Sequence, residues 1–342
     1  MSKTNSPVDV LITMPFSASL IKPLQEVSSL LRITIHPAKN INEVPDELWK
    51  RCEVLYTDRI IPDKELAPNL KWVQHHYAGI DSSVDQIAEV RPNLTVTTLS
   101  GAETSQIAEH VLAMLLAFGR QLPTLFEQQK KSEWPRERWE RFKPRELRTS
   151  TVGIIGYGSI GRQVARLLRE FGSTVLATKN DAMHPVDSGY TPEGMGDPNG
   201  ELVHRLYPAQ ALKSMLKDCD FIVVSVPLSD KTRGLVSAEA LSVCKPTAYL
   251  VDISRGGIVD HSALIKALNE HRLAGAALDV FPEEPLPKKS PLWEIQNVII
   301  TPHIAGISAH YDERAMELFA ENLSRHIADL PLYNVFDIKR GY

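Results

Sequence analysis

The sequence predicts an α/β protein whose strands form parallel sheets. Two observations indicate this fold class. Short apolar runs alternate with segments of helical period along the chain, and the glycine-rich run GYGSIG (156–161) stands between an apolar strand and a helix. Such alternation is typical of βαβ units. The chain has 342 residues, 43% of them apolar, which allows about two domains with sizeable cores.

Composition excludes several classes of function. The formal net charge of −4 argues against a protein that mainly binds nucleic acid or an anionic membrane. The three cysteines, Cys52, Cys219 and Cys244, are widely spaced, which fits a reducing compartment and favours neither a disulfide framework nor a metal site. We find no export signal and no apolar run of about 18 residues that could span a membrane. A cytoplasmic protein that acts on small molecules is therefore expected.

The first hundred residues show an α/β rhythm. The runs VDVLITM (8–14), RITIHP (32–37) and CEVLYT (52–57) are predicted strands, and PDELWKR (45–51) is a predicted helix between two of them. KWVQHHYAGID (71–81) begins as a strand and breaks into a glycine-containing turn. A compact unit is expected to end near residue 100.

A long buried helix is predicted from Glu103, because apolar residues recur at helical spacing after the loop LSGA. The next segment, residues 130–148, contains eight Lys or Arg against four Glu, with Trp134 and Trp139 between them. Basic residues interleaved with aromatics can bind nucleic acid. They can also form an arm whose tryptophans pack on a neighbouring subunit. The acidic net charge favours the second interpretation.

The strongest local signal is TVGIIGYGSIGRQVARLLREFG (151–172), which reads as strand, glycine turn and helix. Glycines permit the tight turn and let the backbone approach a pyrophosphate, whose charge the amides at the helix start would bind. Because the strand and the helix flank the glycines in the right order, we predict a dinucleotide-binding site here.

The following strand, STVLATKND (173–181), bears on the choice of cofactor. NAD-binding proteins carry an acidic residue at its end that bonds the ribose 2′-hydroxyl. Lys179 stands there instead, and its ammonium suits a 2′-phosphate, so NADP(H) is favoured. In the alternative, Asp181 does the acidic residue's work and the cofactor is NAD(H). The Gly- and Pro-rich segment 184–208 is longer than most connections and is expected to cover the adenosine end.

Further buried strands are predicted at CDFIVVSVPL (219–228) and TAYLVDIS (247–254), with a helix at HSALIKALNEH (261–271). Ligands of parallel sheets bind beyond the carboxyl ends of the strands. The turns SVPLSDKT, ISRGG, LDVFPEEP and TPHIAG are therefore expected to meet at one crevice.

These motifs together resemble the D-isomer-specific 2-hydroxyacid dehydrogenases. The resemblance rests on QHHYAGIDSSV, GAETSQIAEHVLAMLLA, GYGSIG, VSVPLSDKTRGLVS, ISRGGIVDHSALIKALNEHRLAGAALDVFPEEPL and SPLWEIQNVIITPHIAG, in this order from about residue 50 to 325. It implies two Rossmann-like domains: a dinucleotide-binding domain, 102–308, inserted into a flavodoxin-like substrate domain formed by 1–101 and 309–342, with two crossing helices as hinge. Members of the family are usually homodimers.

The resemblance also implies three catalytic residues. His303 of TPHIAG would donate a proton to the substrate carbonyl in reduction and accept it in oxidation. Glu284 of FPEEP would orient the imidazole and favour its charged form. Arg255 of SRGG would hold the substrate carboxylate and polarise the carbonyl. Alone, each residue has an ordinary structural explanation, but all three at strand ends beside a glycine fingerprint favour catalysis.

Binding contacts follow from the same resemblance. The N–H groups of Ala78 and Gly79 would bind the substrate carboxylate, and His76 and Tyr77 would line the pocket, although Tyr77 could instead pack in the core. Asp279 would contact the nicotinamide carboxamide or, alternatively, cap a helix. The residues expected to contact the cofactor are Thr104, Gly156, Tyr157, Gly158, Ser159, Ile160, Gly161, Lys179, Val226, Pro227, Thr232, Ile253, Ser254, Asp279, His303 and Gly306.

The implied activity is hydride transfer between NADP(H) or NAD(H) and a small 2-keto acid, with glyoxylate or hydroxypyruvate as the first expectation. Formate dehydrogenases of this family carry Gln where Glu284 stands, which favours a hydroxyacid enzyme. Some family members are corepressors that keep the cofactor site, so a cofactor-sensing binding protein is the alternative. The substrate itself is not fixed by the sequence, because every 2-keto acid presents the same two groups to Arg255.

Overall fold

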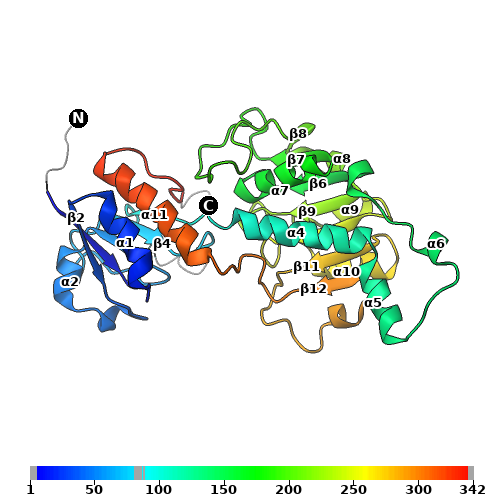
Figure 1. Cartoon of the computed structure of the whole chain (residues 1–342), viewed down its shortest axis with the longest axis horizontal. Helices are drawn as coiled ribbons and strands as arrows, with labels where there is room; N and C mark the ends of the chain where they lie inside the picture. Colours follow the sequence, from blue (N-terminus) through cyan, green and yellow to red (C-terminus); the bar gives the residue numbers. More distant parts are fainter. Residues whose placement is uncertain (1–5, 81–86, 88, 338–342) are drawn as a thin grey trace. The chain divides into compact units, whose positions relative to one another are not determined.

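The structure, a computed structural model, describes residues 6–80, 87 and 89–337. The chain divides into two compact units. Unit 1 consists of Met1–Glu103, Ser188–Tyr190 and Ser308–Tyr342, and unit 2 of Thr104–Asp187 and Thr191–Ile307. Each unit is a parallel sheet with helices packed on it (Figure 1), so the α/β fold class predicted from the sequence is confirmed. No sequence pattern had indicated that the tripeptide 188–190 belongs with unit 1.

Unit 1 contains a five-stranded sheet in the order β2-β1-β3-β4-β5, with all neighbours parallel. This is the flavodoxin-like strand order. Its elements are β1 (Val8–Ile12), α1 (Ala18–Val27), β2 (Leu31–Ile35), α2 (Asp46–Arg51), β3 (Val54–Thr57), β4 (Trp72–His75), β5 (Thr95–Thr97) and α11 (Tyr311–Ile327), with the one-turn helix η1 (Ile41–Glu43).

Alternating strand residues of unit 1 face opposite sides of the sheet, as parallel strands buried on both faces require. One core joins Val10 and Ile12 to apolar residues of α1 and α11, and α1 packs directly against α11. The other core joins Leu11 and Leu55 to Trp49 of α2. Because strands β1, β3 and β4 are covered on both faces, their carboxyl ends are where side chains can reach a ligand.

Unit 2 contains a seven-stranded sheet in the order β12-β11-β10-β9-β6-β7-β8, again all parallel. The strands are β6 (Thr151–Ile155), β7 (Thr174–Lys179), β8 (Arg205–Pro208), β9 (Phe221–Val224), β10 (Tyr249–Asp252), β11 (Gly275–Leu278) and β12 (Val298–Ile300). If β6 to β12 are numbered 1 to 7, the order read from β8 is 3-2-1-4-5-6-7. The first six strands have the order of dinucleotide-binding sheets, and β12 is an additional edge strand. Strand β6 therefore stands where the strand order reverses.

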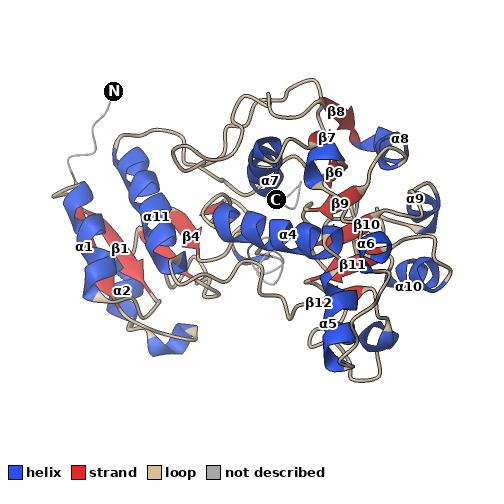
Figure 2. Cartoon of the chain, turned by 45° about the vertical axis from the view of Figure 1, so that its right-hand side comes forward, coloured by secondary structure: helices blue, strands red, loops and turns tan. Residues whose placement is uncertain are grey.

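Helices cover both faces of this sheet (Figure 2). On one face α4 (Thr104–Gly119) and α7 (Ser159–Glu170) bury apolar residues against β6, β9 and β10. On the other lie α8 (Leu212–Leu216), α9 (Ala238–Ser242) and α10 (His261–Asn269). The remaining elements are α5 (Leu122–Lys130), α6 (Arg138–Arg141), η2 (Leu147–Thr149), η3 (Ala209–Ala211) and η4 (Pro291–Glu294). Among the described residues, no helix is long and apolar enough to cross a membrane.

One expectation about this unit needs correction. The sequence suggested a single long connection over 184–208, but its last four residues form the edge strand β8, which pairs with β7 from Leu176↔Arg205 to Lys179↔Pro208. The pattern hid this strand because it is short, has one buried residue, and ends in Pro208, which is tolerated only at a strand end or sheet edge.

Candidate active site

The glycine turn after β6 has the shape that a dinucleotide requires. Gly156 has φ +102°, and a Cβ there would come within 2.7 Å of Val226 Cγ1. At Gly161 a Cβ would lie 2.3 Å from the Gly156 carbonyl oxygen, so this glycine permits close packing of helix and turn. Gly158 caps α7, and a Cβ there would meet nothing within 4 Å. The residues present thus fit a pyrophosphate on the first turn of α7.

The side chain of Tyr157, inside the fingerprint, points away from this open face. It is buried, and its hydroxyl donates to the Asp197 carboxylate. The buried guanidinium of Arg162 stacks 4.6 Å from the Tyr157 ring and donates to the carbonyls of Asp197 and Pro185. It also lies 3.3 Å from a carboxylate oxygen of Asp187. These contacts, which the sequence analysis missed, fix the 184–208 segment to the start of α7.

The end of β7 carries the residues that bear on cofactor choice. The Lys179 ammonium donates to the carbonyls of His184 and Val186, the latter at 3.2 Å. Burial lowers the pKa of Lys179, and the neighbouring positive charge of Arg162 acts in the same direction. Asp181 Oδ2 lies 2.6 Å from His184 Nδ1, a hydrogen bond that lowers the pKa of Asp181. Lys179 and Asp181, the two residues on which the cofactor prediction depends, are thus both hydrogen-bonded to the segment that follows β7.

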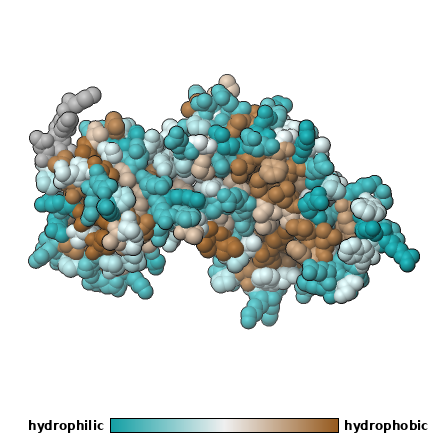
Figure 3. Space-filling view, in the orientation of Figure 1, coloured by the Kyte–Doolittle hydropathy of each residue, from teal (hydrophilic) through white to brown (hydrophobic). Residues whose placement is uncertain are grey.

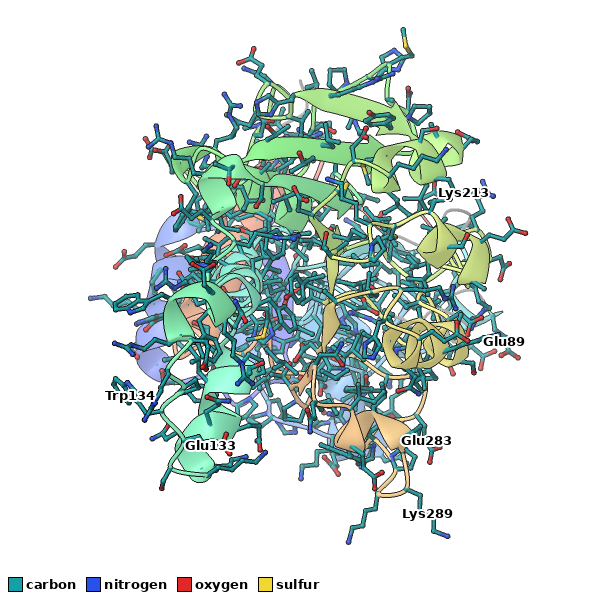
Figure 4. The ribbon with its side chains drawn as sticks, turned by 90° about the vertical axis from the view of Figure 1, so that its right-hand side faces the viewer. Glu89, Glu133, Trp134, Lys213, Glu283 and Lys289 are labelled. Carbon is teal, nitrogen blue, oxygen red and sulfur yellow. The ribbon has the colours of Figure 1, made fainter. Side chains whose placement is uncertain are left out.

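Glu284 and His303 form the central pair of the site. Glu284 Oε2 lies 2.8 Å from His303 Nδ1, and Glu284 Oε1 accepts the Phe281 N–H at 2.8 Å. Burial raises the pKa of Glu284, but the hydrogen bonds from His303 and Phe281, with the positive charges of His303 and Arg255, outweigh burial and lower it. Since Nδ1 is engaged, Nε2 is the atom that can exchange a proton with a ligand. The neighbouring Glu283 is exposed and points outward (Figure 4).

Arg255 lies on the turn after β10 and is half-buried. Its Nη1 donates to the Ser254 carbonyl at 2.9 Å. Ser254 donates its N–H, at 3.1 Å, and its hydroxyl to Oδ1 of Asp252. The turn that carries the arginine is therefore fixed by its own strand end.

Asp279, at the end of β11, holds the turn that carries His303. Its carboxylate accepts the N–H groups of Ile304 and Ala305, each at 2.9 Å, and the Thr301 hydroxyl at 2.6 Å. His303 needs this support because its φ is +53°, in the left-handed region that is costly for most side chains. The sequence predicts that Asp279 contacts the cofactor or caps a helix, but it does not predict this contact with the His303 turn.

The remaining predicted cofactor residues surround the same carboxyl edge of unit 2. Thr232 Oγ1 donates to the Pro227 carbonyl at 2.6 Å and so closes the loop that follows β9 and Val226. Ile253 and Ser254 are buried after β10, and the Gly306 carbonyl accepts a hydrogen bond from Gln106 at 3.1 Å. Thr104 begins α4, while Ser159 and Ile160 form the first turn of α7.

In unit 1, the predicted substrate turn follows β4. His76 Nδ1 lies 2.8 Å from the Tyr56 hydroxyl, and the His76 carbonyl accepts the Tyr311 hydroxyl at 2.9 Å. Burial lowers the pKa of His76, against the opposing charge of Asp312. Tyr77 is 46% exposed, which does not fit the alternative of a core residue. Ala78 and Gly79 are half-buried.

The chain is similar to a known family and to known proteins. The family described as "D-isomer specific 2-hydroxyacid dehydrogenase, NAD binding domain" matches residues 112–305. D-3-phosphoglycerate dehydrogenase of Methanocaldococcus jannaschii is 32% identical over 93% of this chain, which spans only 57% of that protein. Glyoxylate reductase of Pyrococcus furiosus is 35% identical over 76% of this chain and 73% of its own length.

Solved structures of 2-hydroxyacid dehydrogenases are also similar to this chain. A D-isomer-specific 2-hydroxyacid dehydrogenase of Xanthobacter autotrophicus, in complex with NADPH and MES, is 29% identical with a TM-score of 0.79 and covers 98% of this chain and 100% of that one. D-lactate dehydrogenase of Aquifex aeolicus, complexed with NAD and lactic acid, is 26% identical with a TM-score of 0.65 and covers 94% and 96%. Complexes with NADPH and with NAD thus both occur among the similar structures.

Proposed function

Because the chain belongs to the D-isomer-specific 2-hydroxyacid dehydrogenases, which are NAD(P)-dependent oxidoreductases, we propose that it reduces a small 2-keto acid to the D-2-hydroxy acid and catalyses the reverse oxidation. The observation that carries this proposal is the 2.8 Å contact between Glu284 and His303, with Arg255 close enough for its charge to act on Glu284. An acid, its orienting carboxylate and a carboxylate-binding cation are what the reaction requires.

Each of the three side chains has one task. Arg255 binds the substrate carboxylate and draws electron density from the carbonyl, which prepares C2 for attack. A dinucleotide held by the glycine turn and the first turn of α7 would supply the hydride to that carbon. His303 gives its Nε2 proton to the carbonyl oxygen, so that C=O becomes CH–OH, and Glu284 stabilises the imidazolium before the transfer. The N–H groups of Ala78 and Gly79 stay our prediction for a further contact with the carboxylate.

For the cofactor, NADPH is the proposed partner. Support comes from Lys179 at the strand end, where NAD-specific proteins place a carboxylate, and from the charge of Arg162 near it. The Lys179 ammonium donates to two carbonyls, and binding a 2′-phosphate would replace one of these bonds with a stronger charge-assisted bond. NAD(H) remains the alternative through Asp181.

The substrate class we propose first is glyoxylate or hydroxypyruvate, which are small 2-keto acids like the substrate named for the Pyrococcus relative. The arm 130–148 supports a homodimer, because Trp134 and Trp139 are 83% and 75% exposed. Trp134 projects from the edge of the molecule (Figure 4), and apolar residues gather over the neighbouring part of unit 2 around α4 and α5 (Figure 3). We expect this dimer to work in the cytoplasm.

The test is the initial rate of NADPH and, separately, NADH oxidation with glyoxylate, hydroxypyruvate and pyruvate. We expect turnover, faster with NADPH, and Lys179→Ala should lower kcat/KM for NADPH by roughly tenfold or more while sparing NADH. Lys217→Ala, which changes an exposed lysine elsewhere on unit 2, is the matched control. Cofactor binding without any turnover would contradict the reductase and favour the cofactor-sensing alternative. A preference for NADH would contradict only the role of Lys179.

A further inference from the structure

Asp252 is a fully buried acidic residue to which the mechanism above gives no task. It is the last residue of β10 and is 0% exposed. Its Oδ1 accepts both the N–H and the hydroxyl of Ser254, and this closes the tight turn from which Arg255 projects. Arg255 in turn donates back to the Ser254 carbonyl. The carboxyl group therefore sets the backbone that delivers the substrate-binding cation.

The second oxygen of the Asp252 carboxyl group, Oδ2, is not hydrogen-bonded within the described part of the chain. This oxygen is also buried. A charged carboxylate oxygen in that position would carry a large desolvation cost, whereas a neutral carboxylic acid would carry a smaller one. The geometry alone thus favours the protonated group.

A second carboxylate stands at the end of the adjoining strand. The Asp279 N–H donates to the Asp252 carbonyl at 3.0 Å, and the Asp279 carboxylate holds the His303 turn through Ile304 and Ala305. The two aspartates therefore support the two catalytic turns from neighbouring strand ends. Negative charge on both would place like charges together in a buried region.

In the described part of the chain, only Ser254 donates hydrogen bonds to the Asp252 side chain, so no positively charged group contacts it directly. From α4, which packs on β10, His110 lies 3.5 Å from the Thr301 hydroxyl and interacts with Asp279, and burial lowers its pKa. From α10 on the other face, burial also lowers the pKa of His261. For Asp252 itself, burial raises the pKa to about 7, with the charge of Asp279 adding and the Ser254 bonds opposing.

We propose that Asp252 is a positioning residue for Arg255 and that it acts in its protonated form. Loss of its proton creates a second charge beside Asp279 and an unpartnered charged oxygen, and the end of β10 shifts to relieve them, together with the Ser254 turn that is bonded to it. Arg255 then moves from the substrate carboxylate, so that turnover falls in alkaline solution. The kinetic part of this inference rests on the proposed reductase activity, whereas the ionisation of Asp252 can be tested without it.

The kinetic test compares wild type with Asp252→Asn, which mimics the protonated carboxyl group and keeps an acceptor for Ser254. The pH profile of kcat/KM for glyoxylate is measured with saturating NADPH. Wild type should lose one more proton on the alkaline limb than the variant does, and that proton is the one on Asp252. Asp220→Asn removes a half-buried carboxyl group that directly precedes β9 of the same unit and pairs with Lys245 at 3.0 Å, and it should keep the wild-type profile. Superimposable profiles for wild type and Asp252→Asn would overturn the proposal.

A binding test separates positioning from general disruption. Asp252→Ala removes the acceptor for Ser254, which is also a predicted cofactor contact, and should raise KM for glyoxylate by roughly 10- to 100-fold while weakening NADPH binding by much less, since displacement of a positioning group by about 1 Å costs that much. An equal loss of keto-acid and cofactor binding would contradict a role through Arg255.

The third readout needs no turnover. Because the pKa of Asp252 is raised to about 7 in the folded protein, wild type loses stability as pH rises from the ordinary carboxyl range, about 4, to about 7. The gap in Tm between Asp252→Asn and wild type should widen over this range and level off above it. Parallel Tm curves would show that Asp252 does not titrate there and would overturn its protonated role. If no protein reduced any keto acid but the Tm gap widened, the reductase proposal would fail while the protonation of Asp252 stood.

Discussion

Each unit of the molecule places histidine directly beyond a parallel strand, yet the two sites differ in what surrounds the imidazole. In unit 1, β4 ends at His75 and is followed by His76, whose Nδ1 lies 2.8 Å from a tyrosine hydroxyl. In unit 2, His303 follows β12 and lies 2.8 Å from a glutamate. His76 is 5% exposed, whereas the His303 side chain is 45% exposed. Equal contact distances thus occur in different surroundings: burial lowers the pKa of His76, whereas His303 is open to solvent and contacts a carboxylate.

The sharpest test of this contrast is His303→Gln. Loss of the general acid should lower kcat for keto-acid reduction by roughly 10²- to 10⁴-fold and leave NADPH binding nearly unchanged, as measured by steady-state kinetics and fluorescence titration. His271→Gln is the matched control, because His271 is an exposed residue of unit 2 with the same φ of +53°. An equal loss of turnover and cofactor affinity in His303→Gln would contradict its assigned role.

The buried histidines of unit 1 should instead appear in the pH dependence of stability. Burial lowers the pKa of His75 to about 4, below the value near 6.5 of the unfolded chain. The unfolded state therefore binds the extra proton first, and unfolding free energy should fall by about 3 kcal/mol as pH drops from about 6.5 to about 4.

Chemical denaturation at several pH values measures this effect. His75→Asn should flatten the acid side of the stability curve, whereas His36→Asn, which changes a half-buried histidine of the same unit, should not. If the wild-type and His75→Asn curves stayed parallel between pH 4 and 6.5, His75 would not be the titrating group.

Glu284→Gln tests the other half of the comparison, the charge of the partner. The amide keeps an acceptor for the Phe281 N–H but cannot stabilise the imidazolium, so kcat/KM should fall by roughly 30-fold, equivalent to about 2 kcal/mol for a charge-assisted hydrogen bond. Glu283→Gln changes the exposed neighbour, and a comparable loss there would argue against a specific role for Glu284.

The smallest effect is expected for His76→Gln. Because burial already lowers the pKa of His76, its removal should not change the pH profile of kcat, and the loss of turnover should stay under about tenfold. A changed KM for the keto acid would support a place for His76 in the substrate pocket. A changed pH dependence of kcat would show that His76 also takes part in proton transfer, and would contradict its assignment as a residue without that role.

The fold and the central pair were predictable because their signals are local. Each apolar run that ends at a polar turn marks the carboxyl edge of a sheet, and Arg255, Glu284 and His303 all follow such runs. The strand order of both sheets then brings distant turns of one unit together. The family resemblance, confirmed by the comparisons, added the roles that the pattern alone could not assign.

The contacts that escaped prediction depend on folding across segments without periodicity. Nothing near Tyr157 or Arg162 in the sequence indicates that Asp197 lies beside both of them. The strand pattern likewise treats Asp252 as an ordinary polar strand end, because its missing partner and its proximity to Asp279 exist only in three dimensions. His76 and His303 also differ in how far they are buried, and the burial of a turn residue cannot be predicted from its residue type.

The pairing of α1 with α11 in unit 1 has a consequence for how the protein is made. Helix α11 follows all of unit 2 along the chain, so a ribosome releases the whole of unit 2 before the helix that completes the unit 1 core. During that interval Ile21 and Leu24 of α1 lack their partners Phe319 and Leu323. Unit 2 is therefore synthesised completely before unit 1 is complete, and the apolar face of α1 lacks its partner helix until translation reaches α11.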